Sequence, residues 1–443
     1  MNKEIIETLI NNLNKIISVI FFTLLFSVFI LLPENFDIGH YSLKTSYFSI
    51  ISIITTSLLI IFNIRSIKSL KIDIIEILLC IYSLLILVST TNSNYIRESL
   101  WGFPQGRGEG IFTLYSYLLC FYISSKIYNK SKLVENLTTI SVVIISGVGI
   151  LQALIGRYYG FAFEGIKDAE YMSFGTMINP NFFSTFITIF LPIFIISYLH
   201  NKDSYMLYII GILFGALVCS KSLGGYLTFI IYTLVVFIYF IIISKNKKTV
   251  LKQISALLIL FITVFILLNG VNDNKYFEEL NIIKDDIKNV TETSESFGNN
   301  RGYIWSVCFE IVKDNWLFGI GPDSLGREVI SNYMNRDDYI FGELVLDKAH
   351  NEYLHIAVTT GIPSLLVYIL ILGIILFNLV KKFIYYIKNK ELNSDNAIFL
   401  VAISASILAY LVQGIVNISV TCVAPLFWCI LGIGYNIGKS KLV

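Results

Sequence analysis

The sequence predicts an all-α, polytopic membrane protein with about twelve transmembrane helices and one large extracytoplasmic loop. The first observation is composition, because only 14% of the 443 residues are charged and 55% are hydrophobic. A soluble domain carries roughly a quarter charged residues, so lipid must cover part of this chain. The second observation is a series of apolar runs of membrane-spanning length. The third is one long polar stretch, residues 271–349, between the ninth and tenth runs.

Each apolar run is expected to form a helix, because a segment that crosses hydrocarbon must satisfy its backbone hydrogen bonds internally. The expected spans are residues 16–33, 45–63, 72–91, 111–127, 133–155, 180–199, 205–220, 223–243, 250–270, 361–380, 397–418 and 422–438. The chain therefore divides into nine spans, the loop and three further spans, which occupy residues 1–270, 271–349 and 350–443.

Lysine and arginine predict the orientation, because they favour the cytoplasmic side of short loops. With a cytoplasmic N-terminus, the inside segments hold 19 of the 33 basic residues and the short outside loops hold 6. The other 8 are in the large loop, which is too long to follow the rule strictly. Both termini are therefore expected to be cytoplasmic, and residues 271–349 extracytoplasmic.

Charge and cysteine patterns exclude several classes of protein. No basic cluster with interleaved aromatic residues occurs, so we expect no nucleic-acid partner. Only Cys308 lies clearly in the large loop, which makes a disulfide framework improbable. The sequence has no Cys-x-x-Cys pair and no His-Glu-x-x-His motif, and His350 and His355 are too far apart to share one helix face. We therefore expect neither a metal nor another cofactor.

The large loop is acidic, with fifteen Asp and Glu against eight Lys and Arg. Apolar spacing and breaker residues predict its local structure. In order, we expect a helix from Tyr276 to Ile287, a polar break at 291–300, a helix over 304–316, a turn at Gly319–Pro322 and a helix over 350–360.

Two residues around this loop could carry chemistry. His350 stands where the chain returns to the membrane surface, and a neutral imidazole can take a proton from a hydroxyl. The simpler interpretation is an interfacial histidine that caps a helix or extends to the lipid headgroups. Arg301 follows the polar break and precedes the expected helix, and its planar fork suits phosphate and pyrophosphate. The alternative is a solvated surface arginine.

Three further residues lie in the outer loops. Lys221 stands in a tight turn and opposes the charge bias, which indicates an anionic ligand, although contact with lipid headgroups would explain it equally well. Arg107 lies between glycines that permit close approach, although a pair with Glu109 or a plain turn would also explain it. Asn181 belongs to an Asn-Pro-Asn segment typical of a helix start, and its amide could also bind sugar hydroxyls.

The predicted topology places Arg107, Lys221, Arg301 and His350 on the same side of the membrane. Three cations and one titratable base near the outer interface suit a substrate with a phosphate at membrane level and a hydroxyl to be activated. A polyprenyl-pyrophosphate glycan is such a substrate.

Several of these residues fall in motifs, in a defined order. They are Arg301 with Trp305, Gly319-Ile320-Gly321-Pro322, His350-Asn351-Glu352-Tyr353-Leu354 and Gly361-Ile362, with weaker matches at Arg107, Gly110 and Asn181. In this order the chain resembles the O-antigen ligase and O-antigen polymerase family of lipid-linked glycan transferases. One departure is the outer turn Ser222-Leu223-Gly224, where many members have Ser-Arg-Gly. Lys221 would supply the missing charge there, as a point charge rather than a fork.

The resemblance implies a C-type glycosyltransferase-like membrane fold in the cytoplasmic (inner) membrane of a bacterium. It implies an undecaprenyl-pyrophosphate-linked glycan as donor and a glycan, lipid or protein as acceptor, with metal-independent, inverting transfer. Arg301 would hold the pyrophosphate and His350 would deprotonate the acceptor hydroxyl. Lys221, Arg107, Asn181 and Asn351 would bind pyrophosphate or glycan.

Two other classes stay open at this point. A transporter or flippase for lipid-linked sugars would also have about twelve spans, although such proteins usually show repeats and charges near mid-membrane. A non-catalytic membrane partner in polysaccharide assembly would use the loop for protein contacts. Within the family, the motifs do not distinguish a ligase from a polymerase.

Overall fold

The structure is a computed structural model that describes residues 3–33, 37–38, 41–63, 72–103, 108–159, 172–278 and 297–440. These residues are mostly helical. Besides the helices, they form one short antiparallel ribbon, made of β1 (Asp37–Ile38) and β2 (Tyr41–Ser42).

The helices before the large loop are α1 (Lys3–Thr23) with its π-helical continuation η1 (Leu24–Phe29), α2 (Leu43–Asn63), α3 (Ile74–Asn92), α4 (Ile96–Trp101), α5 (Ile111–Ile127), α6 (Lys132–Tyr159), α7 (Pro180–Asn201), α8 (Met206–Cys219), α9 (Leu223–Ile243) and α10 (Lys247–Val271). Those in and after the loop are α12 (Phe297–Asn315), α13 (Leu325–Asn332), α14 (Glu352–Thr360), α15 (Ile362–Lys388), α16 (Asp395–Val416) and α17 (Ala424–Lys439).

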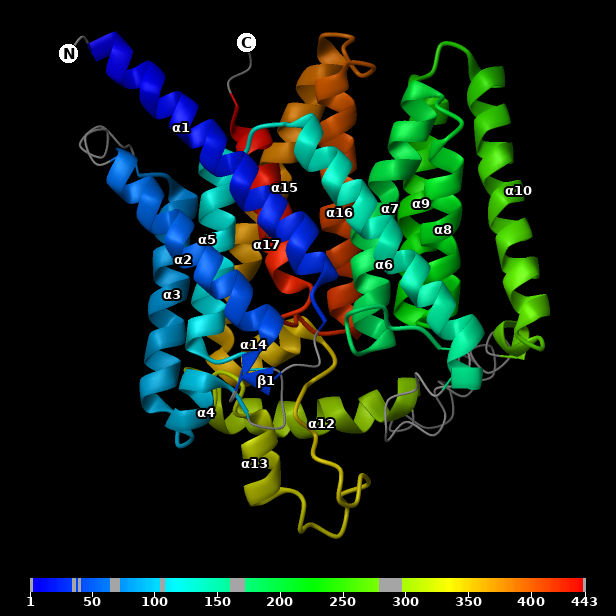
Figure 1. Cartoon of the computed structure of the whole chain (residues 1–443). Coiled ribbons are helices and arrows are strands. Elements are labelled where there is room, and N and C mark those ends of the chain that lie inside the picture. Colours follow the sequence, from blue (N-terminus) through cyan, green and yellow to red (C-terminus); the bar gives the residue numbers. More distant parts are fainter. Residues whose placement is uncertain are drawn as a thin grey trace.

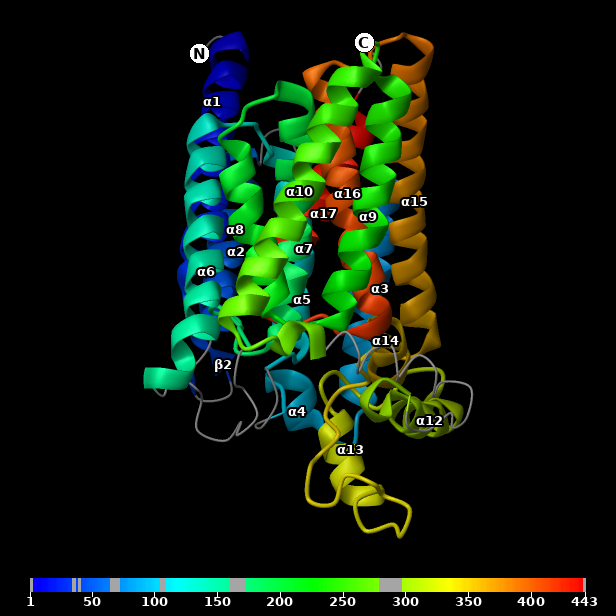
Figure 2. The same cartoon turned by 90° about the vertical axis from the view of Figure 1, so that its right-hand side faces the viewer.

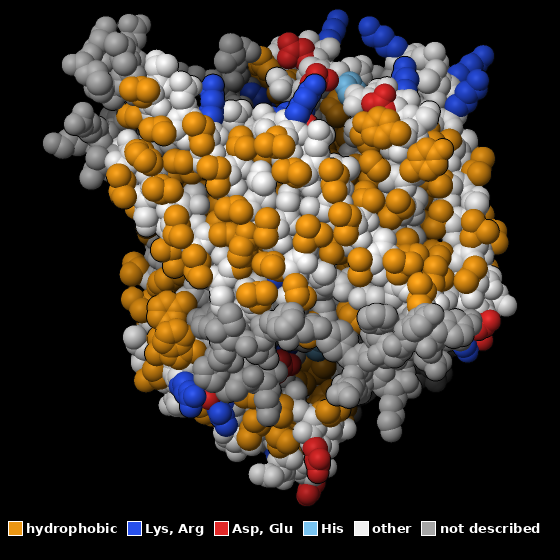
Figure 3. Space-filling model, viewed as in Figure 1, with side chains coloured by type: hydrophobic (Ala, Val, Ile, Leu, Met, Phe, Trp, Pro, Cys, Tyr) orange, Lys and Arg blue, Asp and Glu red, His pale blue; other side chains and the backbone are white. Residues whose placement is uncertain are grey.

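The long helices form a bundle, and the large loop lies beyond one end of it. In Figure 1, α12 runs across that end and α13 projects away from the bundle. Figure 2 shows the same arrangement from the side, with the start of α1 and the end of α17 at the opposite end. On the face in Figure 3, apolar side chains form a broad belt, and lysines and arginines gather above it. This belt is the surface that a lipid bilayer would cover.

Nine helices of the described chain are long and apolar enough to cross a membrane. They include Thr8–Phe29, the continuous segment of α1 and η1, together with α2, α3, α6, α7, α9, α10, α15 and α16. The other three expected spans coincide with α5, α8 and α17, which are helices of 17, 14 and 16 residues. A polytopic helical membrane protein is therefore confirmed, while the count of twelve spans stays a prediction.

The spans differ in how much of their surface other helices cover. In α7, 89% of the apolar window is buried, so this helix lies inside the bundle. In α10 the buried share is 22%, so most of its side chains face outward. A helix that is apolar all round can occupy either place, because lipid and protein interiors both accept apolar side chains.

The large loop has an apolar core of its own, which it shares with α14. Side chains of α12, α13 and the segment before α14 form this core, with Cys308, Val329 and Val358 among the fully buried members. All six cysteines of the chain are free. The loop is thus held on α14 by apolar contact.

The local predictions for the loop need one correction. α12 begins at Phe297, so residues 297–300 are helical where a polar break was expected. Asn300 has a φ of +64° within this helix, a conformation that asparagine tolerates better than most residues. Of the helix expected from Tyr276 to Ile287, residues 279–287 lie outside the described chain.

Candidate functional site

Arg301 lies in α12 rather than before it, and its side chain is half-buried. It makes no ion pair with any described residue. By contrast, Arg327 is held by Glu98 at 2.9 Å and Arg336 by Glu310 at 3.1 Å. Burial lowers the pKa of the Arg301 guanidinium from its ordinary value, because the charged form loses solvent. A partly desolvated guanidinium without a counter-charge is suited to a phosphate group.

Trp305 connects the helix of Arg301 to the segment of His350. Its indole N–H donates a hydrogen bond to the Ala349 carbonyl at 3.0 Å. Arg301 and Trp305 are four residues apart, so they share one face of α12. That face is therefore the one turned toward the residues around His350.

His350 and Asn351 form the entrance to α14. The Asn351 side-chain oxygen accepts the backbone N–H of Leu354 at 3.0 Å, so Asn351 is the N-cap. The interpretation of His350 as the capping residue is therefore wrong. His350 has a φ of +47°, an uncommon conformation for a residue other than glycine. Its imidazole stands outside the helix and is partly exposed.

Asn181 lies in a polar network at the start of α7, the start of α9 and the end of α16. Asn179 accepts the backbone N–H of Asn181 at 2.9 Å, which confirms the predicted helix start. The Asn181 side-chain oxygen accepts the Ser222 hydroxyl at 2.8 Å. Its backbone carbonyl accepts the Asn417 amide at 3.2 Å. Asn181 thereby ties the turn between α8 and α9 to the end of α16.

Lys221 belongs to this same turn and has a φ of +51°. Its ammonium lies over the ring of Tyr276, 5.9 Å from the centroid, in a cation–π contact. Arg107 lies outside the described residues. Glu109, its expected partner, forms an ion pair with Lys348 at 2.6 Å.

The C-terminal end of α16 connects the two groups of candidates. Asn417 contacts Asn181, as above. Gly414, one turn earlier, faces α14 so closely that an added Cβ would lie 3.2 Å from a carboxylate oxygen of Glu352. The Asn181 network and the beginning of α14 therefore lie around one helix end.

A buried ion cluster, which we call the Lys348 cluster, lies beneath His350. Lys348 donates hydrogen bonds of 2.6 Å to Glu109 and to Asp323, and all three side chains are buried. Asp323 also accepts the backbone N–H groups of Phe103 and Glu109 at 2.8 and 3.1 Å. Burial alone would lower the Lys348 pKa, but the two carboxylates hold it above its ordinary value. The cluster ties together three segments that are distant in sequence.

A small cavity adjoins this cluster, with a volume of about 50 Å³. Glu352 and His355 of α14 line it, together with further residues of α14 and residues from α3, α5, α15, α17 and three loops, namely Tyr82, Glu109, Leu114, Tyr117, Pro322, Asp323, Ile356, Thr359, Thr360, Tyr368, Ser419 and Trp428. The Tyr368 hydroxyl donates to Glu352 at 2.7 Å. The buried Nδ1 of His355 has no hydrogen-bond partner among the described residues.

These buried titratable groups were not found from the sequence. Glu352 was noted only as part of a motif, and His355 only as a poor metal partner for His350. One signal was available, since Asp323 follows the Gly319–Pro322 turn directly and Lys348 precedes His350 by two residues. The pairing of Lys348 with Glu109 could not be predicted from the sequence, because 239 positions separate the two residues.

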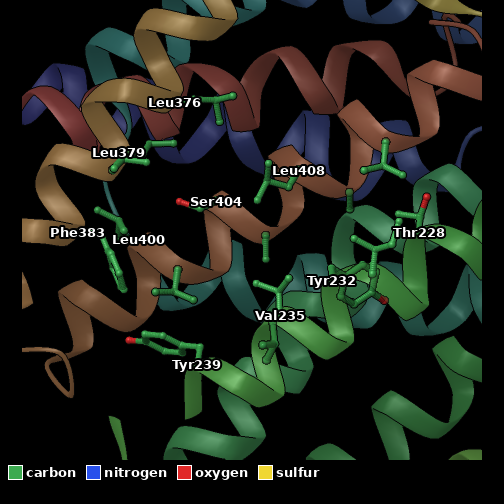
Figure 4. Close-up of a pocket in the computed structure, with 17 residues that line it drawn as sticks. Thr228, Tyr232, Val235, Tyr239, Leu376, Leu379, Phe383, Leu400, Ser404 and Leu408 are labelled. Atoms are coloured by element: carbon green, nitrogen blue, oxygen red, sulfur yellow. The ribbon is translucent and has the colours of Figure 1, made fainter. Parts of the chain in front are cut away.

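An apolar groove runs along the membrane-facing side of α9, α15 and α16, with a volume of about 480 Å³. In Figure 4, Thr228 and Tyr239 of α9 stand toward its two ends, and Leu408 and Leu400 of α16 lie across from them. Most of its seventeen lining side chains are apolar. Such a groove accepts a hydrocarbon chain rather than a polar ligand.

The fold and these contacts define a class: a polytopic helical membrane protein with charged and titratable residues gathered at one end of its bundle. Residues 208–369 match the family model described as O-Antigen ligase. This match confirms the family resemblance for a segment that runs from α8 through the large loop into α15, and it contains Lys221, Arg301 and His350. No curated protein matches the chain.

Proposed function

We propose that this protein transfers glycan from an undecaprenyl-pyrophosphate-linked donor to an acceptor hydroxyl at the outer face of a bacterial cytoplasmic membrane. The observation that carries the proposal is Arg301, a half-buried cation with no ion-pair partner in the described chain. It lies one helical turn from Trp305, which is bonded to the residue before His350. The family match supports O-antigen ligase-type chemistry.

In this proposal the sugar–pyrophosphate bond is already activated. The protein therefore needs only to orient the two substrates and to stabilise the departing pyrophosphate. Arg301 binds the pyrophosphate and stabilises the charge that grows on it as it departs. His350 accepts the proton of the acceptor hydroxyl. Attack from the opposite face inverts the anomeric centre, and no metal takes part. Asn351 acts by holding the start of α14, since its side chain is occupied as a cap.

The remaining candidates would bind other parts of the donor. Lys221 and Arg107 supply further positive charge, and the amide of Asn181 contacts sugar hydroxyls. The polyprenyl chain lies against the apolar surface of the bundle, where the groove of α9, α15 and α16 offers a seat for it. Residues 271–349 then act as a cover over the bundle formed by 1–270 and 350–443. The end with α12 and α13 faces outward, and both termini are cytoplasmic.

The decisive experiment is transfer by the purified protein in lipid nanodiscs, with lipid-linked donor and acceptor. We expect His350→Ala and Arg301→Ala each to lower the transfer rate by about 100-fold or more, because each removes a group that acts in the transition state. Arg336→Ala is the matched control, since this arginine is exposed and paired with Glu310. It should keep the wild-type rate.

Full activity of both His350→Ala and Arg301→Ala would show that the assignment is wrong. Movement of the lipid-linked donor across the vesicle membrane, without transfer of glycan to the acceptor, would favour a transporter. Assays with a chelator test the absence of a metal, and the anomeric configuration of the product tests inversion. The size distribution of the product separates stepwise polymerisation from transfer of a finished chain.

A further inference from the structure

We propose that the cavity beside the Lys348 cluster, which Glu352 and His355 line, is a hydrated proton-accepting chamber. In this role it takes up, through water, the proton that leaves the acceptor hydroxyl at His350. The Glu352 carboxylate is the acceptor and His355 relays the proton. The inference rests on the proposed function and extends it to two residues that contact neither donor nor acceptor.

The chamber lies directly behind His350 in the chain. α14 begins two residues after His350, and its first residue is Glu352. Glu352 and His355 are three residues apart, so they share one helix face. Both side chains line the cavity. The charge of His350 also lowers the pKa of His355, so the two imidazoles lie within electrostatic reach of each other.

The cavity has the size to hold water, and polar groups line part of its mostly apolar surface. Its volume of about 50 Å³ exceeds the roughly 10–15 Å³ that one water molecule needs. Polar atoms from several elements face it, which is the second condition for buried water. Among them is the Nδ1 of His355, a buried atom that no described residue satisfies. A bound water would supply this missing partner.

The charges around the chamber leave Glu352 without a cation of its own. Lys348 is engaged by both Glu109 and Asp323 at 2.6 Å. The other titratable groups around Glu352 are the tyrosine hydroxyls of residues 82, 117, 353, 368 and 410. Burial raises the pKa of Glu352 to about 7, although the Tyr368 hydrogen bond opposes the shift. This carboxyl can therefore gain and lose a proton near neutral pH.

His355 is suited to passing a proton rather than holding it. Burial lowers its pKa well below the ordinary value, and the charges of Lys348 and His350 lower it further. The imidazole therefore stays neutral, with one nitrogen as donor and the other as acceptor. Such a ring can relay a proton between water and a carboxylate.

The step balances without a further reactant. The acceptor O–H bond breaks as its oxygen bonds the sugar carbon, and the sugar–phosphate bond breaks with both electrons on the departing pyrophosphate. His350 takes the proton, which then moves through water and His355 to the Glu352 carboxylate. Glu352 later releases it to the outer solution, which restores the starting state.

The test is the pH profile of kcat for Glu352→Gln and His355→Gln in the nanodisc assay. Only ionised Glu352 can accept, so wild-type kcat should rise with pH through a midpoint near 7. We expect Glu352→Gln to lower kcat on the order of 10- to 100-fold, keep both KM values and change the midpoint of this rise, since the remaining pH dependence would come from His350 alone. His355→Gln should lower kcat and keep the midpoint. The control is Glu343→Gln, which removes an exposed carboxyl of the large loop. It should keep the wild-type kcat and pH profile.

Two kinetic results would overturn the chamber while leaving the proposed function intact. One is wild-type kcat in both variants. The other is a lower kcat with an unchanged pH profile in Glu352→Gln, which would indicate a structural role. If wild type itself does not transfer, the proposed function fails, and infrared titration tests the chamber separately. A protonated-carboxyl band that titrates near pH 7 and disappears in Glu352→Gln supports it, and its absence overturns it.

Discussion

Lys348 is a fully buried cation whose charge is matched by two buried carboxylates. Lys348→Met keeps the volume but leaves Glu109 and Asp323 facing each other without a cation. Removing one partner of a buried ion pair typically costs about 3–5 kcal/mol of folding free energy. We therefore expect a much lower thermal midpoint in detergent, measured by differential scanning fluorimetry.

The control for this change is Lys313→Met in α12, because Lys313 is exposed and should alter stability by less than about 0.5 kcal/mol. Neutralising both acids in the Lys348→Met background, with Glu109→Gln and Asp323→Asn, should recover part of the loss, since no unpaired charge is left buried. Equal stability of Lys348→Met and Lys313→Met would mean that the cluster does not hold these segments together.

At the scale of elements, the turn after α12 is fastened to the end of α14. Ile320 and Gly321 donate their N–H groups to the carbonyls of Val358 and Thr359 at 3.0 and 2.8 Å. These carbonyls are the ones that a helix end leaves without partners. Gly319 permits this contact, because its φ is +65° and an added Cβ would lie 2.5 Å from the Thr359 carbonyl carbon.

Gly319→Ala should therefore separate the turn from α14 and displace α12 relative to His350. We expect a lower thermal midpoint and a loss of transfer activity of at least about tenfold, because misplacement of catalytic groups is costly. Gly373→Ala in α15 is the matched control, since no atom lies within 4 Å of its added Cβ. Normal stability and activity of Gly319→Ala would contradict this role for the turn.

The helices could be predicted from the sequence, whereas the contacts between them could not. Length and apolarity identify a span, because hydrocarbon requires internal hydrogen bonding. The Gly319–Pro322 turn could be predicted for a similar local reason, since it needs positive φ values. The Lys348 cluster depends instead on folding, which brings Glu109 and Asp323 to a lysine 239 and 25 positions away. The role of Asn351 as the N-cap was not predicted, because the sequence does not show at which of two neighbouring polar residues the helix begins.

At the scale of the whole molecule, the two ends of the helical bundle differ in the charged residues that they carry. Figure 3 shows lysines and arginines gathered at the upper end of the face in view, the end at which Figure 1 shows the start of α1 and the end of α17. The other end carries Arg301, His350, the Lys348 cluster and the loop that covers them. A substrate held at membrane level would contact these groups only from that second side. The proposed function therefore requires that this end of the bundle face the side of the membrane on which the substrate lies.

Cysteine labelling in intact bacterial cells tests this orientation. Ser331→Cys, exposed at the end of α13, should react with a membrane-impermeant maleimide, because the loop end is expected to face outward. Lys248→Cys, exposed at the start of α10, should react only after the membrane is permeabilised. Both are made in a Cys80→Ser background, since the other five native cysteines are buried. Labelling of Lys248→Cys but not Ser331→Cys in intact cells would invert the topology and place the site in the cytoplasm.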